Sequence, residues 1–182
     1  MTTEGYLLDT TVASQAVDGQ SPYCAAVRGY LAGLADAMLY VSMFTVGEIE
    51  YGLGVSPAID PARHAAARAA LAEYEVLPVD HHTAREFGRI RAELFKRFSP
   101  RDRRGRLTAK VPEDLREPTT AKELGIQEND LWIASVAVQY DLRFLTMDRA
   151  GGMRRVLEAA GYLDRTDFFV RPETAPTPVE TP

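Results

Sequence analysis

The sequence is poor in cysteine and histidine and has no long apolar run. Its single cysteine, Cys24, cannot form a disulfide within the chain. The three histidines (His64, His81 and His82) do not have the spacing of a zinc site. No stretch of about 18 apolar residues is present, and no basic region followed by an apolar one opens the sequence. We therefore expect neither a membrane span nor a signal peptide, no membrane partner, and a cytoplasmic location.

The chain also lacks an excess of basic residues. The sequence has 21 Lys and Arg but 26 Asp and Glu. The net charge of −5 argues against a generally basic nucleic-acid-binding surface, but it does not exclude a local basic patch. What the 182 residues do contain is 46% hydrophobic residues, which suits one globular domain with a proper core. We expect that domain over residues 1–170 and a disordered, proline- and threonine-rich tail over 171–182.

Short apolar runs alternate with segments of helical spacing. An apolar run bounded by polar residues is typical of a buried parallel strand, and a repeat at i, i+3 and i+4 is typical of a helix. The runs predict strands over 6–8, 38–41, 75–79, 142–146 and 168–170. The helical pattern occurs between 12 and 39, where one or two helices fit, and over 43–54, 64–73, 83–95, 128–140 and 152–160. The pattern therefore predicts an α/β domain.

Four acidic residues are expected at one edge of the sheet. Asp9 and Asp148 follow strands, and Glu48 and Asp130 lie in the first turns of helices. If the strands are parallel, these positions converge where open α/β sheets bind ligands. A simpler interpretation also exists, because aspartates beside helix starts are ordinary caps or charges favoured by the helix dipole.

Such a cluster suggests a metal site. Crowded carboxylates repel and raise one another's pKa values, and a divalent cation is the usual remedy. Oxygen ligands without His or Cys favour Mg²⁺ or Mn²⁺. These ions can bind a phosphodiester, lower the pKa of an attacking water and neutralise the leaving oxygen. The inferred chemistry is phosphodiester hydrolysis, with one or two ions held directly or through water by Asp9, Glu48, Asp130 and Asp148.

The composition changes between the helices predicted over 83–95 and 128–140. Residues 96–110 are mostly basic, and the following stretch to 128 contains prolines and is mostly acidic. We expect a long charged loop or insertion over 99–126, with or without a short helix, and such loops are uncommon unless functional or mobile. Its basic half could bind phosphates, or it could be a solvated loop that neutralises the acidic half.

Four blocks of the sequence, in this order, resemble PIN-domain ribonucleases, and most closely the toxin component of VapBC-type toxin–antitoxin pairs. The resemblance extends over residues 5 to 157 and covers most of the chain. The blocks are LLDTTV with Asp9, SMFTVGEIEYG with Thr45 and Glu48, AREFGRIRAEL, and NDLWIASVAVQYDLRFLTMD with Asp130 and Asp148.

The resemblance implies a three-layer α/β/α PIN-like fold with a central parallel sheet of about five strands, and an acidic pocket for Mg²⁺ or Mn²⁺. Family members cleave RNA, commonly form homodimers, and are inhibited by a cognate antitoxin whose C-terminal segment wraps over the toxin. We therefore expect a Mg/Mn-dependent endoribonuclease with an RNA substrate and an antitoxin partner. The residues implied are the acidic Asp9, Glu48, Asp130 and Asp148 and the supporting Thr10, Thr45 and Thr146. As a separate hypothesis from the basic stretch, RNA or the antitoxin is bound by Arg101, Arg103, Arg104 and Arg106.

Other functions stay open at this point. Asp9 also resembles the nucleophile of haloacid-dehalogenase-like phosphatases, but Thr11 stands where that family usually has a second Asp. The chain could also be a PIN nuclease outside any toxin pair. A third possibility is a non-catalytic interaction module whose carboxylates only cap helices.

Overall fold

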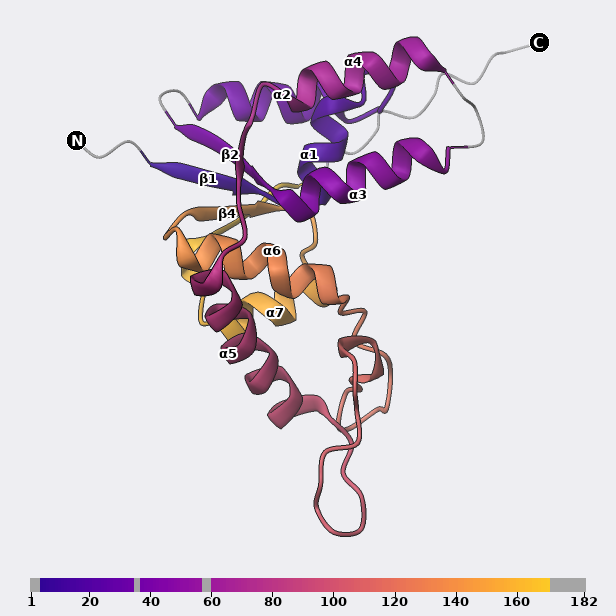
Figure 1. Ribbon diagram of the computed structural model, residues 1–182, viewed down its shortest axis with the longest axis vertical. Coiled ribbons are helices and arrows are strands. Elements are labelled where there is room, and N and C mark those ends of the chain that lie inside the picture. Colours follow the sequence, from indigo (N-terminus) through magenta and orange to yellow (C-terminus); the bar gives the residue numbers. More distant parts are fainter. Residues whose placement is uncertain (1–3, 35–36, 57–59, 171–182) are drawn as a thin grey trace, which may run out of the picture.

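A five-stranded parallel sheet lies between two layers of helices (Figure 1). The computed structural model describes residues 4–34, 37–56 and 60–170. Neighbouring strands follow the order β3-β2-β1-β4-β5, and every pair is parallel. The strands are β1 (Gly5–Leu8), β2 (Met38–Ser42), β3 (Glu75–Leu77), β4 (Arg143–Thr146) and β5 (Thr166–Phe168). The predicted α/β class and three-layer architecture are confirmed.

The register of the three central strands brings their carboxyl ends to one edge. Leu8, at the end of β1, pairs with Val41 of β2 and Leu145 of β4. The Asp9 N–H then donates to the carbonyl oxygen of Leu145 at 2.9 Å, which continues the ladder by one more bond. Asp9, just after β1, and Ser42, the last residue of β2, therefore lie next to each other. They mark the edge of the sheet where the helices α1 and α3 begin.

The helices divide into two layers because both faces of the sheet are apolar. Side chains alternate between the faces along a strand, so Leu7 and Phe144 pack on one core cluster whereas Leu8 and Leu145 pack on the other. Figure 1 shows the first four helices on one side of the sheet and the other three on the opposite side. They are α1 (Thr10–Val17), α2 (Cys24–Gly33), α3 (Met43–Gly54) and α4 (Pro61–Leu71), then α5 (His81–Phe98), α6 (Glu128–Gln139) and α7 (Gly152–Ala160). No helix within these described residues is long and apolar enough to cross a membrane.

Among the strands, the predicted boundaries differ most at the last one, which was expected over 168–170. Strand β5 begins two residues earlier because its extent is set by pairing with β4, where Phe144 lies opposite Thr166. Its middle residue, Asp167, forms an ion pair with Arg143 at 2.5 Å. Strand β5 is therefore not a continuous apolar run. An edge strand with a charged residue gives a weak pattern.

The segment 99–126 has little regular structure but is attached to the core. It contains a 3₁₀ turn at Pro112–Asp114 and two isolated antiparallel bridges. Leu115, Leu124 and Ile126 are fully or almost fully buried and belong to the core cluster beneath α5, α6 and α7. The second half of the segment is therefore packed against the domain, while its first half projects beyond α5 (Figure 1). The tail predicted over 171–182 lies outside the described residues.

Candidate acidic site at the carboxyl edge of the sheet

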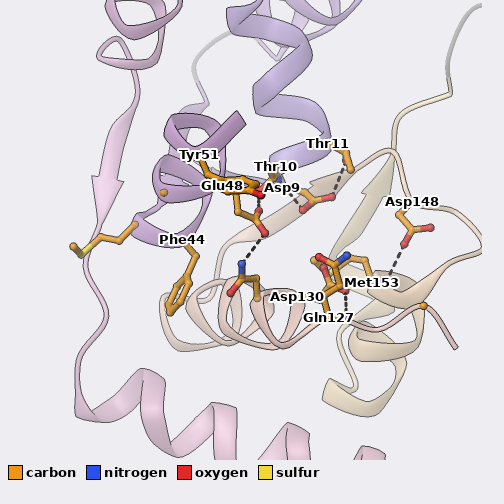
Figure 2. Close-up of a pocket in the computed structure, with 14 residues that line it drawn as sticks. Asp9, Thr10, Thr11, Phe44, Glu48, Tyr51, Gln127, Asp130, Asp148 and Met153 are labelled. Atoms are coloured by element: carbon orange, nitrogen blue, oxygen red, sulfur yellow. Dashed lines mark hydrogen bonds between the residues drawn. The ribbon is translucent and has the colours of Figure 1, made fainter. Parts of the chain in front are cut away.

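An open cavity of about 700 Å³ lies at the carboxyl edge of the sheet (Figure 2). It is lined by residues of α1, α3, α6 and α7 and of the loops after β1, before α6 and after β4. All four predicted carboxylates are among its lining residues, namely Asp9, Glu48, Asp130 and Asp148. The parallel strands therefore bring together side chains that are up to 139 positions apart in the sequence, as the positions of Asp9 and Asp148 show.

Asp9 is the most deeply buried of the four, with only 3% of its surface exposed. Its Oδ1 accepts the N–H of Thr10 at 2.8 Å, and its Oδ2 accepts the hydroxyls of Thr11 at 2.7 Å and Thr146 at 2.6 Å. Burial raises the pKa of Asp9, an effect that these three hydrogen bonds oppose and the charge of Glu48 reinforces. The carboxylate is thus held in one orientation by neighbours on β4 and α1.

Glu48 lies on α3 and faces the start of α1. Helix α3 begins after Ser42, whose hydroxyl accepts the N–H of Thr45 at 3.0 Å as an N-cap. One turn further, Glu48 accepts the hydroxyl of Thr10 at Oε2 and the side-chain amide of Asn129 at Oε1, the latter at 2.9 Å. Glu48 therefore connects α1, α3 and α6 across the cavity (Figure 2).

Asp130 is in the first turn of α6 and forms a capping box. Its Oδ2 accepts the N–H of Gln127 at 2.9 Å. Burial raises the pKa of Asp130 to about 7, and the charges of Asp9, Glu48 and Asp148 add to that rise, whereas the bond from Gln127 opposes it. The charges of all three other carboxylates thus act on Asp130 in addition to its burial.

Asp148 is turned towards α7. Its Oδ1 accepts the N–H of Gly151 at 2.6 Å and its Oδ2 accepts the N–H of Met153 at 3.0 Å, so it caps that helix. Figure 2 shows it on the opposite side of the cavity from Glu48. In this arrangement, no group of three or more Asp, Glu, His or Cys side chains within the described ranges is placed to hold a metal ion.

The donor set nevertheless suits a hard divalent cation. The acidic residues offer carboxylate oxygens to the cavity. The negative charges of the other three carboxylates make the ionised form of Asp130 less favourable. A divalent ion would relieve that cost.

The remaining predicted residues separate into two groups. Thr10 donates to Glu48, and Thr146 donates to Asp9. Thr45 is fully buried, and its hydroxyl oxygen lies 3.0 Å from that of Ser42. The four arginines do not line the cavity; they lie in the segment that projects beyond α5 (Figure 1). These arginines are Arg101, Arg103, Arg104 and Arg106.

Two residues with evident roles at the cavity were not predicted. Asn129 donates to Glu48, and Thr11 donates to Asp9. Their positions beside Asp130 and Asp9 in helical first turns are the only signal in the sequence. Phe44 and Tyr51 of α3 add apolar surface to the cavity wall (Figure 2).

The raised pKa of Asp130 predicts that folding becomes less favourable as pH rises. Between the ordinary value of 3.8 and about 7, the folded chain keeps a proton that the unfolded chain has lost, so the free energy of unfolding falls through this window. The loss is on the order of 2–4 kcal/mol and levels off above the folded pKa.

Urea unfolding at pH 5 and pH 8 in EDTA-containing buffer would measure this effect. Asp130→Asn keeps an acceptor for the Gln127 N–H but removes the titration. The variant should therefore gain stability relative to the wild type on going from pH 5 to pH 8. A difference between the two proteins that is the same at both pH values would contradict the raised pKa.

Comparison with known proteins identifies the family. The sequence pattern of the PIN domain matches residues 6–157. No curated protein matches the chain. Among solved structures, FitAcB from Neisseria gonorrhoeae superposes with a TM-score of 0.55 at 22% identity, covering 83% of this chain and 92% of that one.

Two further structures are similar at low identity. VapBC-5 from Mycobacterium tuberculosis, a member of the VapBC family of toxin–antitoxin systems, gives a TM-score of 0.51 at 23% identity, covering 90% of this chain and 96% of that one. VapBC2 from Rickettsia felis, bound to a DNA fragment from its promoter, gives 0.55 at 19% identity, with coverage of 79% and 88%. At these identities the similarity to the solved structures shows the fold alone. The match to the PIN-domain sequence pattern, in contrast, covers most of the chain. The protein belongs to the PIN domain family.

Proposed function

We propose that this protein is a metal-dependent endoribonuclease and the toxin component of a VapBC-type toxin–antitoxin pair. The observation that carries the proposal is the convergence of Asp9, Glu48, Asp130 and Asp148 on one cavity of a PIN domain. The reaction is hydrolysis of an RNA phosphodiester bond, with water as the nucleophile.

Mg²⁺ or Mn²⁺ is the proposed cofactor, held by the four carboxylates directly or through water. When bound, the ion supplies a water of lowered pKa and positive charge for the leaving oxygen. The chain's own residues supply orientation. Thr11 and Thr146 fix the Asp9 carboxylate, and Asn129 fixes Glu48, so these ligands need little reorganisation when an ion or a phosphate arrives.

An antitoxin is the proposed protein partner. The support comes from the solved neighbours, because VapBC-5 is described as part of a toxin–antitoxin system. A homodimer and a cytoplasmic location are proposed on the same family resemblance.

A non-catalytic interaction module is the second candidate. The observation in its favour is that Asp130 and Asp148 both accept backbone N–H groups at helix starts, as ordinary capping residues do. A protein of this kind would keep its fold and its partner but would neither bind Mn²⁺ nor cleave RNA.

The test is cleavage of a panel of structured and single-stranded RNAs by purified protein with Mg²⁺, Mn²⁺ or EDTA. We expect cleavage with either ion, none with EDTA, and its loss in Asp9→Asn and in Asp130→Asn. Cleavage in EDTA would exclude the metal-dependent mechanism. A folded protein that neither cleaves any RNA nor binds Mn²⁺ would favour the interaction module.

A further inference from the structure

The basic part of the projecting segment forms an ordered hairpin over residues 100–108, here called the basic hairpin. The N–H of Asp102 donates to the carbonyl oxygen of Arg106, and the N–H of Gly105 donates back to the carbonyl oxygen of Asp102, both at 2.9 Å. Gly105 has a φ of +76°, a conformation that glycine adopts without strain at such a turn. The tip is therefore a built turn between paired chain segments.

The four arginines of the basic hairpin have different roles. Arg106 forms an ion pair with Asp102 at 2.7 Å, and Arg101 donates to the carbonyl oxygen of Gly105 at 2.9 Å, so these two hold the hairpin together. Arg103 and Arg104 occupy the exposed tip. Among the residues that the structure describes, neither of these two side chains has an ion-pair or hydrogen-bond partner.

The chain just after the basic hairpin is tied to the start of α6, next to residues that line the acidic cavity. The guanidinium of Arg91, on α5, donates to the carbonyl oxygen of Lys110 at 2.8 Å and to Glu128 at 3.1 Å. Glu128 is the first residue of α6, two positions before Asp130. From this anchor the hairpin projects away from the sheet (Figure 1).

Two unpaired guanidinium groups at the tip of a hydrogen-bonded hairpin suit a phosphate chain better than a single small anion. Arg is well matched to phosphate because its planar donors bind two oxygens together. The chain as a whole carries a net charge of −5, so a polyanion would be repelled elsewhere and attracted to this tip.

We propose that Arg103 and Arg104 bind the phosphate backbone of folded RNA at a distance from the acidic cavity, so that the protein selects RNAs long enough to reach both. This inference rests on the proposed ribonuclease function and adds a substrate class to it. Arg101 and Arg106 act only by shaping the basic hairpin.

The test compares two variants that lower the net charge equally, Arg103→Gln/Arg104→Gln and Arg85→Glu. Arg85 is exposed on α5, far along that helix from the basic hairpin. Binding of a labelled RNA stem-loop and of a trinucleotide is measured by fluorescence anisotropy in EDTA, which prevents cleavage, between 50 and 200 mM NaCl.

We expect the double variant to bind the stem-loop about tenfold more weakly, and the slope of log affinity against log salt to fall by about 1.4–1.8. The trinucleotide should show no such difference, and Arg85→Glu should resemble the wild type with both RNAs. Unchanged stem-loop affinity and salt slope in the double variant would overturn the proposal and assign the tip to another partner, such as an acidic protein segment.

The two proposals fail separately. If the wild type binds the stem-loop through the tip but never cleaves RNA with Mg²⁺ or Mn²⁺, the proposed ribonuclease function is wrong and the RNA contact stands. If the wild type cleaves RNA and the double variant binds and cleaves the stem-loop equally well, the proposed contact is wrong.

Discussion

Asp9→Asn should reduce RNA cleavage by about 10³-fold without lowering the melting temperature. The charge of Asp9 is proposed to hold the metal ion, and an amide nitrogen in its place cannot serve as a ligand. Asparagine has the same shape, and its Oδ1 can still accept the N–H of Thr10. The hydroxyls of Thr11 and Thr146 can turn to accept from the new Nδ2, because each hydroxyl oxygen has two lone pairs.

The stability of this variant follows from the cost of burying a carboxylate. Asp9 is 3% exposed and has a raised pKa, so its ionised form is less favourable in the fold than in water. The neutral amide avoids this penalty and removes one charge that opposes Asp130. We therefore expect an unchanged or higher melting temperature together with the loss of cleavage.

The measurement is kcat/KM with Mn²⁺ alongside calorimetric unfolding. Asp164→Asn is a matched control because Asp164 is exposed, does not line the cavity and loses the same charge. It should cleave RNA as the wild type does. If Asp9→Asn kept more than about a tenth of the wild-type activity, Asp9 would not be a metal ligand; a removed ligand is expected to cost far more.

Strand and helix positions could be predicted largely because the sheet is buried on both faces. Leu7, Leu8, Phe144 and Leu145 are fully buried, so β1 and β4 leave uninterrupted apolar runs in the sequence. Strand β5 lies at the edge and contains the ion-paired Asp167, which the apolar pattern cannot reveal. The order of the strands could not be predicted from local sequence patterns either. It depends on which face of the sheet each connecting helix crosses.

The candidate site shows where sequence patterns stop. Strand ends place acidic residues at one edge, but they do not say how each carboxylate is turned. The bond from Asn129 to Glu48 joins residues 81 positions apart and depends on how α6 approaches α3. In the same way, the composition groups four arginines together, whereas the turn geometry pairs Arg106 with Asp102 and leaves the tip arginines unpaired.

The second large effect is expected at Gly152, the first residue of α7. A Cβ at this position would lie 2.0 Å from the carbonyl oxygen of Gly125 and 2.7 Å from the Cα of Ile126. Both are backbone atoms, and Ile126 is only 1% exposed, so neither can move without displacing buried structure. Gly152→Ala should lower the free energy of unfolding by about 3 kcal/mol, which corresponds to a fall of about 6–12 °C in melting temperature.

The consequence should extend to the cavity, because Gly125 lines it and the chain continues directly into the first turn of α6. A shift of this segment would move Asp130, so cleavage by Gly152→Ala should fall even at temperatures where the variant is folded. Gly88→Ala is the control, since Gly88 is exposed in the middle of α5 with open space at its Cβ position. There alanine should stabilise the protein by about 0.5–1 kcal/mol. Equal stability of Gly152→Ala and the wild type in urea unfolding would mean that segment 99–126 does not pack against α7 as closely as described.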